Sequence, residues 1–268
     1  MATSNPAFSN SPAFSQSATK AMQWTQEPSA QQLDELYARS AATPDDMGRM
    51  TYENTIQKTV GAFAVLLVFA AVGWFVPGLW IIGGIVGFVL ALVNIFKREP
   101  SPALILAYAG AQGLFVGGIS AFYQSLWDGI VVQAVLGTLA VVGVTLALFA
   151  SGKIRASKRA TQIFLVAMIG YAVFSLVNFG LMAFGVTSSM FGLRDTIFLG
   201  MPLGFWLGIL VVLMAAYSLV LDFDSVKTGV ERGAPAKYGW TAAFGIVVTV
   251  IWLYLEILRL LAILRGNN

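Results

Sequence analysis

Long apolar runs separated by short polar segments dominate the chain after residue 50. Each run holds roughly 17–25 residues, which is the length that a helix needs to cross the hydrocarbon core of a bilayer. A transmembrane β-barrel would instead show segments of roughly 10 residues in which apolar and polar residues alternate. The pattern therefore predicts an all-α polytopic membrane protein with seven spans, at residues 60–76, 79–96, 102–122, 130–150, 163–184, 197–221 and 240–264.

Proline and polar residues mark several ends of these spans. Pro77 and Gly78 separate the first two, and Pro100 ends the second because proline disfavours a helical conformation in the residue before it. Pro202 is expected within the first turns of the sixth span, where a helix tolerates proline best. The first span is expected to continue a helix whose polar first turns begin near Thr51.

Glycines at four-residue spacing predict how the spans pack. They lie on the second, third and sixth spans: Gly83, Gly87, Gly113, Gly117, Gly200, Gly204 and Gly208. Glycine lets two helix backbones approach closely in a bilayer, where the hydrophobic effect does not drive helices together. We expect these glycines to form contacts within one chain rather than a dimer interface.

Residues 1–50 have a different composition, rich in Ser, Ala, Gln, Asn and Pro with sparse mixed charge. Such a segment cannot bury enough apolar surface to fold alone. We therefore predict a disordered cytoplasmic tail at residues 1–50 and a seven-helix transmembrane domain at residues 51–268. The tail repeats Pro-Ala-Phe-Ser at residues 6–9 and 12–15. This repeat is interpreted either as a docking motif for a membrane-protein partner or as a product of low complexity.

The composition supports a membrane protein and narrows its chemistry. The chain is 57% apolar and 11% charged, whereas about a quarter of the residues in a soluble domain are charged. Cysteine and histidine are absent, which excludes disulfides, thiolate or imidazole metal sites, and nucleophilic mechanisms that use either residue. We therefore expect no enzymatic activity and no cofactor.

The basic residues lie mainly in short loops on one side of the predicted spans. That side carries the tail together with Lys97, Arg98, Lys153, Arg155, Lys158, Arg159, Lys227, Arg232 and Lys237. The opposite side carries Arg194 and Arg265. Because positive loops are retained in the cytoplasm, we predict a plasma-membrane protein with a cytoplasmic N-terminus and an external C-terminus. The sequence pI near 9.2 thus reflects topology, and nucleic acid is not expected as a partner.

Two acids, Asp222 and Asp224, are expected at the cytoplasmic end of the sixth span. A carboxylate is disfavoured at a helix C-terminus, where the macrodipole is negative, so a functional role weighs evenly against a solvated helix end. Residues two apart point about 200° apart around a helix, so only one of the two acids can face the bundle interior.

Glu256 lies well inside the seventh span, with Arg259 three residues later. Acids at membrane depth are costly and are rarely kept without a use. One interpretation is a local ion pair between Glu256 and Arg259 near the outer interface. The other is a polar path along the seventh span, in which Glu256 titrates or transiently binds a cation.

Several motifs together resemble the Bax inhibitor-1 or YccA-like membrane protein family over residues 55–265. They are Lys-Arg-Glu-Pro-Ser-Pro at residues 97–102, the segment 133–138 in the fourth span, Asp-Phe-Asp-Ser at residues 222–225, and the apolar seventh span. The segment 256–261 and the long tail resemble the actinobacterial branch. The resemblance implies a fold in which the other six spans wrap the seventh.

The resemblance also implies a pH-sensitive calcium leak gated by two carboxylates, one ending the sixth span and one in the seventh. Asp224 matches the first position and is taken as the inward-facing acid, and Glu256 is the acid that this chain offers in the seventh span. Our leading hypothesis is a passive leak for Ca²⁺ or H⁺, with Asp224 and Glu256 as possible transient Ca²⁺ ligands. The alternative is a non-conducting regulator that binds membrane proteases or other membrane partners.

Overall fold

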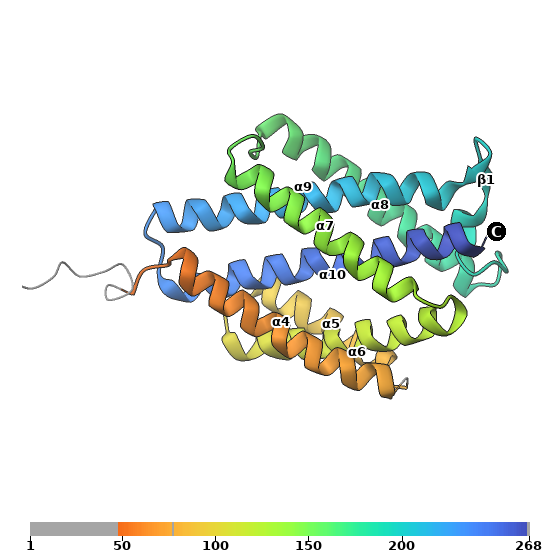
Figure 1. Ribbon diagram of the computed structural model, residues 1–268, viewed down its shortest axis with the longest axis horizontal. Helices are drawn as coiled ribbons and strands as arrows, with labels where there is room; N and C mark the ends of the chain where they lie inside the picture. The colour runs from red at the N-terminus through yellow and green to blue at the C-terminus, as the bar shows by residue number, and fades with distance from the viewer. Residues whose placement is uncertain (1–47, 77, 267–268) are drawn as a thin grey trace, which may run out of the picture. The chain divides into compact units, whose positions relative to one another are not determined.

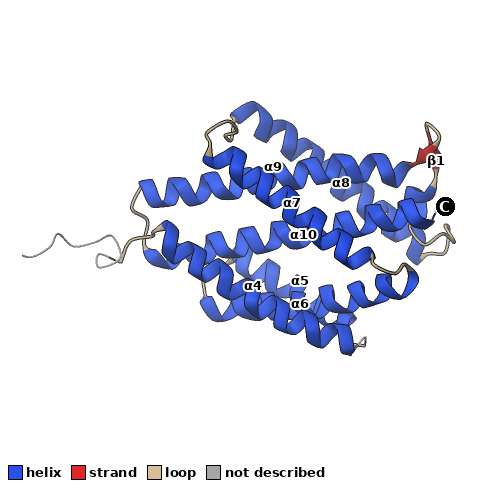
Figure 2. Ribbon diagram, viewed as in Figure 1, coloured by secondary structure: helices blue, strands red, loops and turns tan. Residues whose placement is uncertain are grey.

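The structure is a computed structural model that describes residues 48–76 and 78–266. Most of this part of the chain is helical (Figure 2). Seven of its helices are long and apolar enough to cross a membrane, which confirms the predicted architecture. They are α4 (Tyr52–Phe75), α5 (Leu79–Phe96), α6 (Pro102–Leu126), α7 (Ile130–Ala150), α8 (Lys158–Ala183), α9 (Leu203–Glu231) and α10 (Gly239–Gly266). The predicted disordered tail, apart from residues 48–50, and its repeat lie outside the described residues.

The helix α4 begins with polar turns, as expected. Thr51 is extended and its side-chain oxygen accepts a hydrogen bond from the backbone N–H of Asn54 at 3.1 Å. This N-cap satisfies one of the backbone donors that a helix start leaves unpaired. Just before it, the backbone N–H of Met50 donates to the carbonyl oxygen of Ala234 at 2.7 Å. The start of α4 is thereby attached to the turn between α9 and α10.

The sixth span does not start at residue 197, and this prediction was wrong. Residues Ile197–Phe198 (β1) pair with Met201–Pro202 (β2) as an antiparallel hairpin. The turn between them places Leu199 and Gly200 at positive φ values of 51° and 78°. Two consecutive positive φ values fit the twist of a two-residue hairpin and cannot continue a right-handed helix. Pro202 is therefore the N-cap of α9 and not part of its first turns.

The far end of α9 also differs from expectation. The helix continues past the predicted end at residue 221 to Glu231. Asp222 and Asp224 consequently lie inside the helix, more than a full turn before its last residues. The unfavourable macrodipole at a helix C-terminus falls off within the last turn. The macrodipole therefore gives no reason to assign a role to either acid. Whether either acid has a role depends on its contacts with other residues.

Close glycine contacts join α4, α5 and α6 within the chain, as predicted. A Cβ added at Gly117 of α6 would meet the backbone carbonyl of Ala70 on α4. A Cβ added at Gly83 of α5 would lie 2.7 Å from the carbonyl oxygen of Ala111 on α6. These helices approach so closely that backbone meets backbone, which favours dispersion contacts in a bilayer.

The last helix, α10, packs against α4, α6, α7 and α9. It contributes to both buried apolar clusters, with Val247 and Ile251 in one and Leu253 and Leu258 in the other. Figure 1 shows α10 running along the bundle with α9 on one side and α4 on the other. The prediction that all six other spans wrap this helix goes further than these contacts and stays a prediction.

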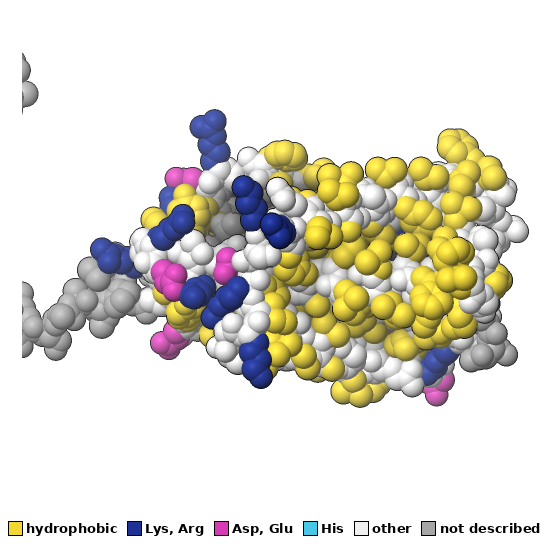
Figure 3. Space-filling view, turned by 90° about the horizontal axis from the view of Figure 1, so that it is seen from above, with side chains coloured by type: hydrophobic (Ala, Val, Ile, Leu, Met, Phe, Trp, Pro, Cys, Tyr) yellow, Lys and Arg dark blue, Asp and Glu magenta, His cyan; other side chains and the backbone are white. Residues whose placement is uncertain are grey.

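The surface divides into an apolar body and a charged end. Figure 3 shows exposed apolar side chains along the length of the bundle and most of the Lys and Arg side chains gathered at one end. At that end, Lys237 donates to a carboxylate oxygen of Glu99 at 2.9 Å. The hydrogen bond and the positive charge of Lys237 lower the pKa of the Glu99 carboxyl. The loops between α5 and α6 and between α9 and α10 are joined by this ion pair.

Candidate functional site

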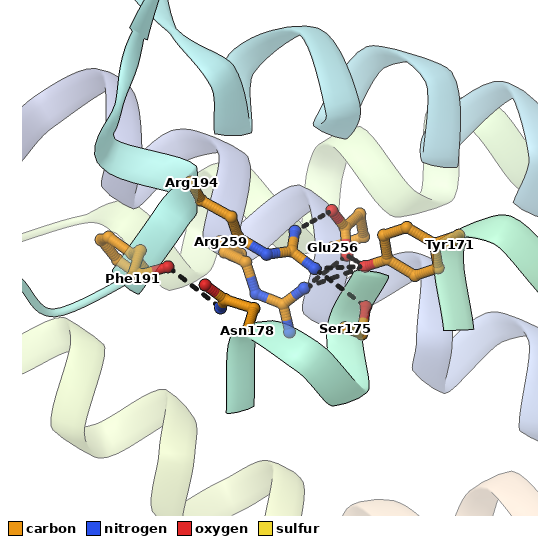
Figure 4. A network of polar contacts seen from close by, with 7 residues as sticks. All are labelled: Tyr171, Ser175, Asn178, Phe191, Arg194, Glu256 and Arg259. Carbon is orange, nitrogen blue, oxygen red and sulfur yellow. Dashed lines mark hydrogen bonds and ion pairs between the residues drawn. The ribbon is translucent and has the colours of Figure 1, made fainter. Parts of the chain in front are cut away.

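Glu256 lies at the centre of a network of charged and hydroxyl groups (Figure 4). Its side chain is only 2% exposed, and both carboxylate oxygens are paired. One oxygen lies 2.7 Å from Nη1 of Arg259, and the other lies 3.4 Å from Nη1 of Arg194. The local pair with Arg259 is therefore present, but it is half of a larger arrangement. Arg194, expected from the sequence as a loop charge, is the second basic partner of Glu256.

Arg194 reaches Glu256 from the connection between α8 and α9. It belongs to the 3₁₀ helix η2 (Gly192–Asp195), and its side chain is 5% exposed. Asn178 of α8 holds this turn in place, because its carbonyl oxygen accepts from the backbone N–H of Leu193 at 2.7 Å and its amide donates to the carbonyl of Phe191 at 3.2 Å. Asn178 thus fixes the turn that carries Arg194.

Tyr171 of α8 completes the network. Its hydroxyl donates to Glu256 at 2.8 Å and accepts from Arg259 Nη1 at 3.1 Å and from Arg194 Nη2 at 3.0 Å. Ser175, one turn along α8, accepts from Arg194 Nη2 at 3.3 Å. Arg194 also lies over the ring of Tyr171, 5.3 Å from its centroid, an arrangement that stabilises a desolvated guanidinium.

A sequence signal for this face of α8 existed and was missed. Tyr171, Ser175 and Asn178 are spaced by four and three residues, so they line one side of α8, whose other residues from Ile163 onward are apolar. A polar stripe on a membrane span indicates a buried polar partner. The stripe alone does not identify that partner, which is an arginine from the turn between α8 and α9.

The network carries an excess positive charge. Two arginines and one glutamate leave one positive charge without an acid inside it. Asp195, the residue after Arg194, is occupied elsewhere, since its carboxylate accepts from the backbone N–H of Phe191 at 3.1 Å. In this conformation, the two arginines and Tyr171 bind the Glu256 carboxylate. The excess positive charge repels a cation that approaches the network.

The second polar site lies between α9 and α10. The hydroxyl of buried Thr249 donates to a carboxylate oxygen of Asp222 at 2.7 Å and lies 3.3 Å from the hydroxyl of Ser218. Gly245, one turn before Thr249, leaves room for the Asp222 carboxylate, because a Cβ there would lie 3.1 Å from its other oxygen. Asp222 therefore faces α10, and the expectation that Asp224 is the inward-facing acid was wrong.

Asp224 lies on a different side of α9 and is half-buried. The hydroxyl of the next residue, Ser225, does not bind it but donates to the carbonyl oxygen of Leu221 at 2.8 Å. The side chains of Asp222 and Asp224 diverge as their two-residue spacing requires. Of the two acids, Asp222 therefore makes the contact with α10.

The two polar sites are distinct. Thr249 and Glu256 are seven residues apart on α10, which corresponds to roughly 10 Å along a helix axis. No group of three or more acidic side chains that could hold a metal ion occurs among residues 48–76 and 78–266. A Ca²⁺ ion at Glu256 would have to displace both arginines. The structure therefore does not bring Asp224 and Glu256 into one metal site.

These features define a polytopic α-helical membrane protein with two internal polar sites, one around Glu256 and one at the α9–α10 interface. A family model described as Bax inhibitor 1 like matches residues 5–266. The chain therefore belongs to the Bax inhibitor-1 family, which its motifs had suggested. No curated protein matches the chain.

Proposed function

We propose that this protein is a passive, pH-sensitive leak for Ca²⁺ or H⁺ in the plasma membrane, and that the conformation described here is closed. The observation that carries the proposal is the contact between Asp222 and Thr249. A carboxylate in a membrane-spanning helix is held there by a hydroxyl group. No Lys or Arg of the described chain lies within ion-pair distance of it. Intramembrane acids of this kind commonly belong to ion or proton pathways.

Protonation of Asp222 would change the α9–α10 contact directly. An ionised carboxylate only accepts hydrogen bonds, whereas the protonated acid also donates one. The Thr249 hydroxyl, which donates to Asp222 in this structure, could then accept a hydrogen bond from the protonated acid. Its own O–H would be free to donate to the hydroxyl of Ser218. Gain or loss of one proton thereby alters how α9 and α10 are joined, without first breaking an ion pair.

The network around Glu256 supplies the closed state of the proposed pathway. Its excess positive charge opposes cations, and Arg259, Arg194 and Tyr171 hold α8, η2 and α10 together. Opening would require Arg194 or Arg259 to leave Glu256, which would expose a carboxylate to the permeant ion. Asp224, half-buried on another side of α9, would attract cations at the inner mouth.

Flux through reconstituted protein tests the proposal. Liposomes that contain the purified protein and an internal calcium or pH dye should show ion entry above that of empty liposomes, with a rate that changes with pH. Absence of flux for both ions at every pH would overturn the leak. The family member would then be a non-conducting regulator, and crosslinking to membrane proteases in cells would be the next measurement.

The orientation proposed for this function places the basic end in the cytoplasm. Arg194 strengthens the argument, because it is buried among the helices and does not act as a loop charge. The external side then presents Arg265 alone among the basic residues of the described chain that lie in loops or at helix ends there. The positive-inside rule counts exposed loop charges near the spans, so the asymmetry becomes larger than the sequence indicated.

A further inference from the structure

A long groove runs between α4 and α7 on the surface that faces the bilayer. Its volume is about 1250 Å³, and its floor is formed by α6 and α10. Apolar side chains line both walls and the floor, among them Ile56, Val60, Leu67, Val135, Leu139, Leu146, Val250 and Ile251. The groove follows α4 from Tyr52 to Phe75, a path comparable with the roughly 30 Å thickness of the hydrocarbon core.

The shape and lining of the groove suit a hydrocarbon chain. A site for a small polar ligand places several polar groups around a compact cavity of roughly 300–1,000 Å³. Here the hydroxyls of Thr55 and Thr59 already donate to the backbone carbonyls of Thr51 and Thr55, at 2.8 Å each. The body of the groove therefore offers dispersion contacts along its length and little hydrogen bonding.

One end of the groove is basic. Arg155, from the turn between α7 and α8, and Lys227 of α9 both line it, and no acidic residue is among its described lining residues. The guanidinium of Arg155 lies over the ring of Phe149, 4.4 Å from the centroid, which directs it over the groove. No acid within residues 48–76 and 78–266 forms an ion pair with Arg155. Lys227 has an exposed partner, Glu231, at 3.6 Å.

We propose that this groove binds one anionic glycerophospholipid, with an acyl chain between α4 and α7 and the phosphate at Arg155 and Lys227. A guanidinium binds phosphate oxygens in a bidentate manner, and basic pockets between membrane helices on the cytoplasmic side recognise anionic headgroups. An apolar groove of membrane length whose basic end has no acid among its lining residues favours an anionic phospholipid over an uncharged lipid. The proposal does not depend on the leak function.

Native mass spectrometry of the full chain in detergent tests the headgroup contact. Palmitoyl-oleoyl phosphatidylglycerol should bind as a single copy and more tightly than phosphatidylcholine with the same acyl chains. Because each basic residue contributes roughly fivefold to anionic lipid binding, the double variant Arg155→Gln/Lys227→Gln should bind phosphatidylglycerol roughly 25-fold more weakly. The matched control, Lys153→Gln/Lys158→Gln, removes two nearby basic residues that do not line the groove and should keep the affinity. Equal losses in the two double variants would overturn the proposal.

A second pair of variants tests the acyl chain. Ala71 lines the groove and is exposed, so Ala71→Trp should fill it and abolish the single bound phosphatidylglycerol. Val166 is 72% exposed on α8, away from the groove, and Val166→Trp should leave binding unchanged. Each variant carries one additional exposed indole, so the two should have similar stability. A thermal melt of each variant in detergent would verify this. Unchanged binding in Ala71→Trp would show that only the headgroup is bound and would overturn the groove as the site.

Discussion

Arg194, from the turn between α8 and α9, lies with its Nη1 atom 3.4 Å from a carboxylate oxygen of Glu256 in the middle of the last helix. The two residues are 62 positions apart, and both side chains are almost completely buried. An arginine from a connection that should be external is thus part of the interior of the bundle. We therefore expect the packing of η2 against α10 to depend on this pair.

Replacement of Glu256 should be strongly destabilising. Glu256→Gln would leave Arg194 and Arg259 close together without an acid, and removal of one partner from a buried ion pair costs about 3–5 kcal/mol. Unfolding in detergent, followed by the circular dichroism signal of the helices, measures the loss of unfolding free energy. Glu99→Gln is the control, since the pair of Glu99 with Lys237 is exposed and pairs of that kind contribute about 0–1 kcal/mol. Similar losses in both variants would contradict the assigned network.

The effects of replacing Arg194 and Glu256 on the free energy of unfolding should not be additive. In Arg194→Gln, Glu256 keeps the pair with Arg259, so the loss should be smaller than in Glu256→Gln. The double variant should lose less stability than the sum of the two single variants, by about 0.5–3 kcal/mol. Arg265→Gln combined with Glu256→Gln is the matched control. Arg265 binds the carbonyl oxygen of Asp128 and the side chain of Gln133 instead, so its effect should be additive.

Asp222 and Asp224 should differ in their effect on ion flux. The amide replacement Asp222→Asn removes the titrating group that Thr249 binds and should abolish most of the pH dependence. Asp224→Asn should lower the flux rate but keep the shape of the pH profile, because its side chain does not join α9 to α10. Dye-loaded liposomes with each variant give both quantities. A flat profile in Asp224→Asn beside an intact one in Asp222→Asn would reverse the assignment.

The α4–α6 contact should not tolerate a single methyl group. Gly117→Ala would push Cβ into the backbone carbonyl of Ala70, and overpacking of this kind costs about 1–3 kcal/mol. Gly170→Ala on α8 is the matched control, because nothing lies within 4 Å of its added Cβ and alanine is the better helix former. Thermal melts of the two variants should therefore shift in opposite directions. A stabilised Gly117→Ala would show that the helices are further apart.

Impermeant maleimide labelling checks the proposed orientation, because the native chain has no cysteine. Single cysteines replace Lys153 in the turn after α7 and Ser188 in the turn after α8, both of which are exposed. In intact cells Ser188→Cys should react and Lys153→Cys should react only after lysis. The opposite pattern would place Asp224 and the basic end of the groove outside the cell.

The apolar pattern was sufficient to determine the number of membrane-spanning helices in the described part of the chain and their approximate extents. A span must satisfy all of its backbone hydrogen bonds internally, so composition and length alone select a helix. The same argument cannot locate a helix end precisely. At Leu199 and Gly200 a turn with two positive φ values interrupts the apolar run, so the helix begins only after it. A leucine in the sequence does not indicate such a conformation. At Asp222 and Asp224, where the pattern predicted the end of the span, the helix continues through polar residues to Glu231.

The sequence by itself also identified Glu256 and its local partner Arg259, since residues three apart on a helix are neighbours. Only the tertiary structure showed that Arg194 is the second partner and that Asp222, not Asp224, faces α10. The physical reason is the same in both cases. The rotation of one helix relative to another, and the depth to which a turn folds back, depend on packing between residues far apart in the chain, and an isolated segment carries no record of that packing.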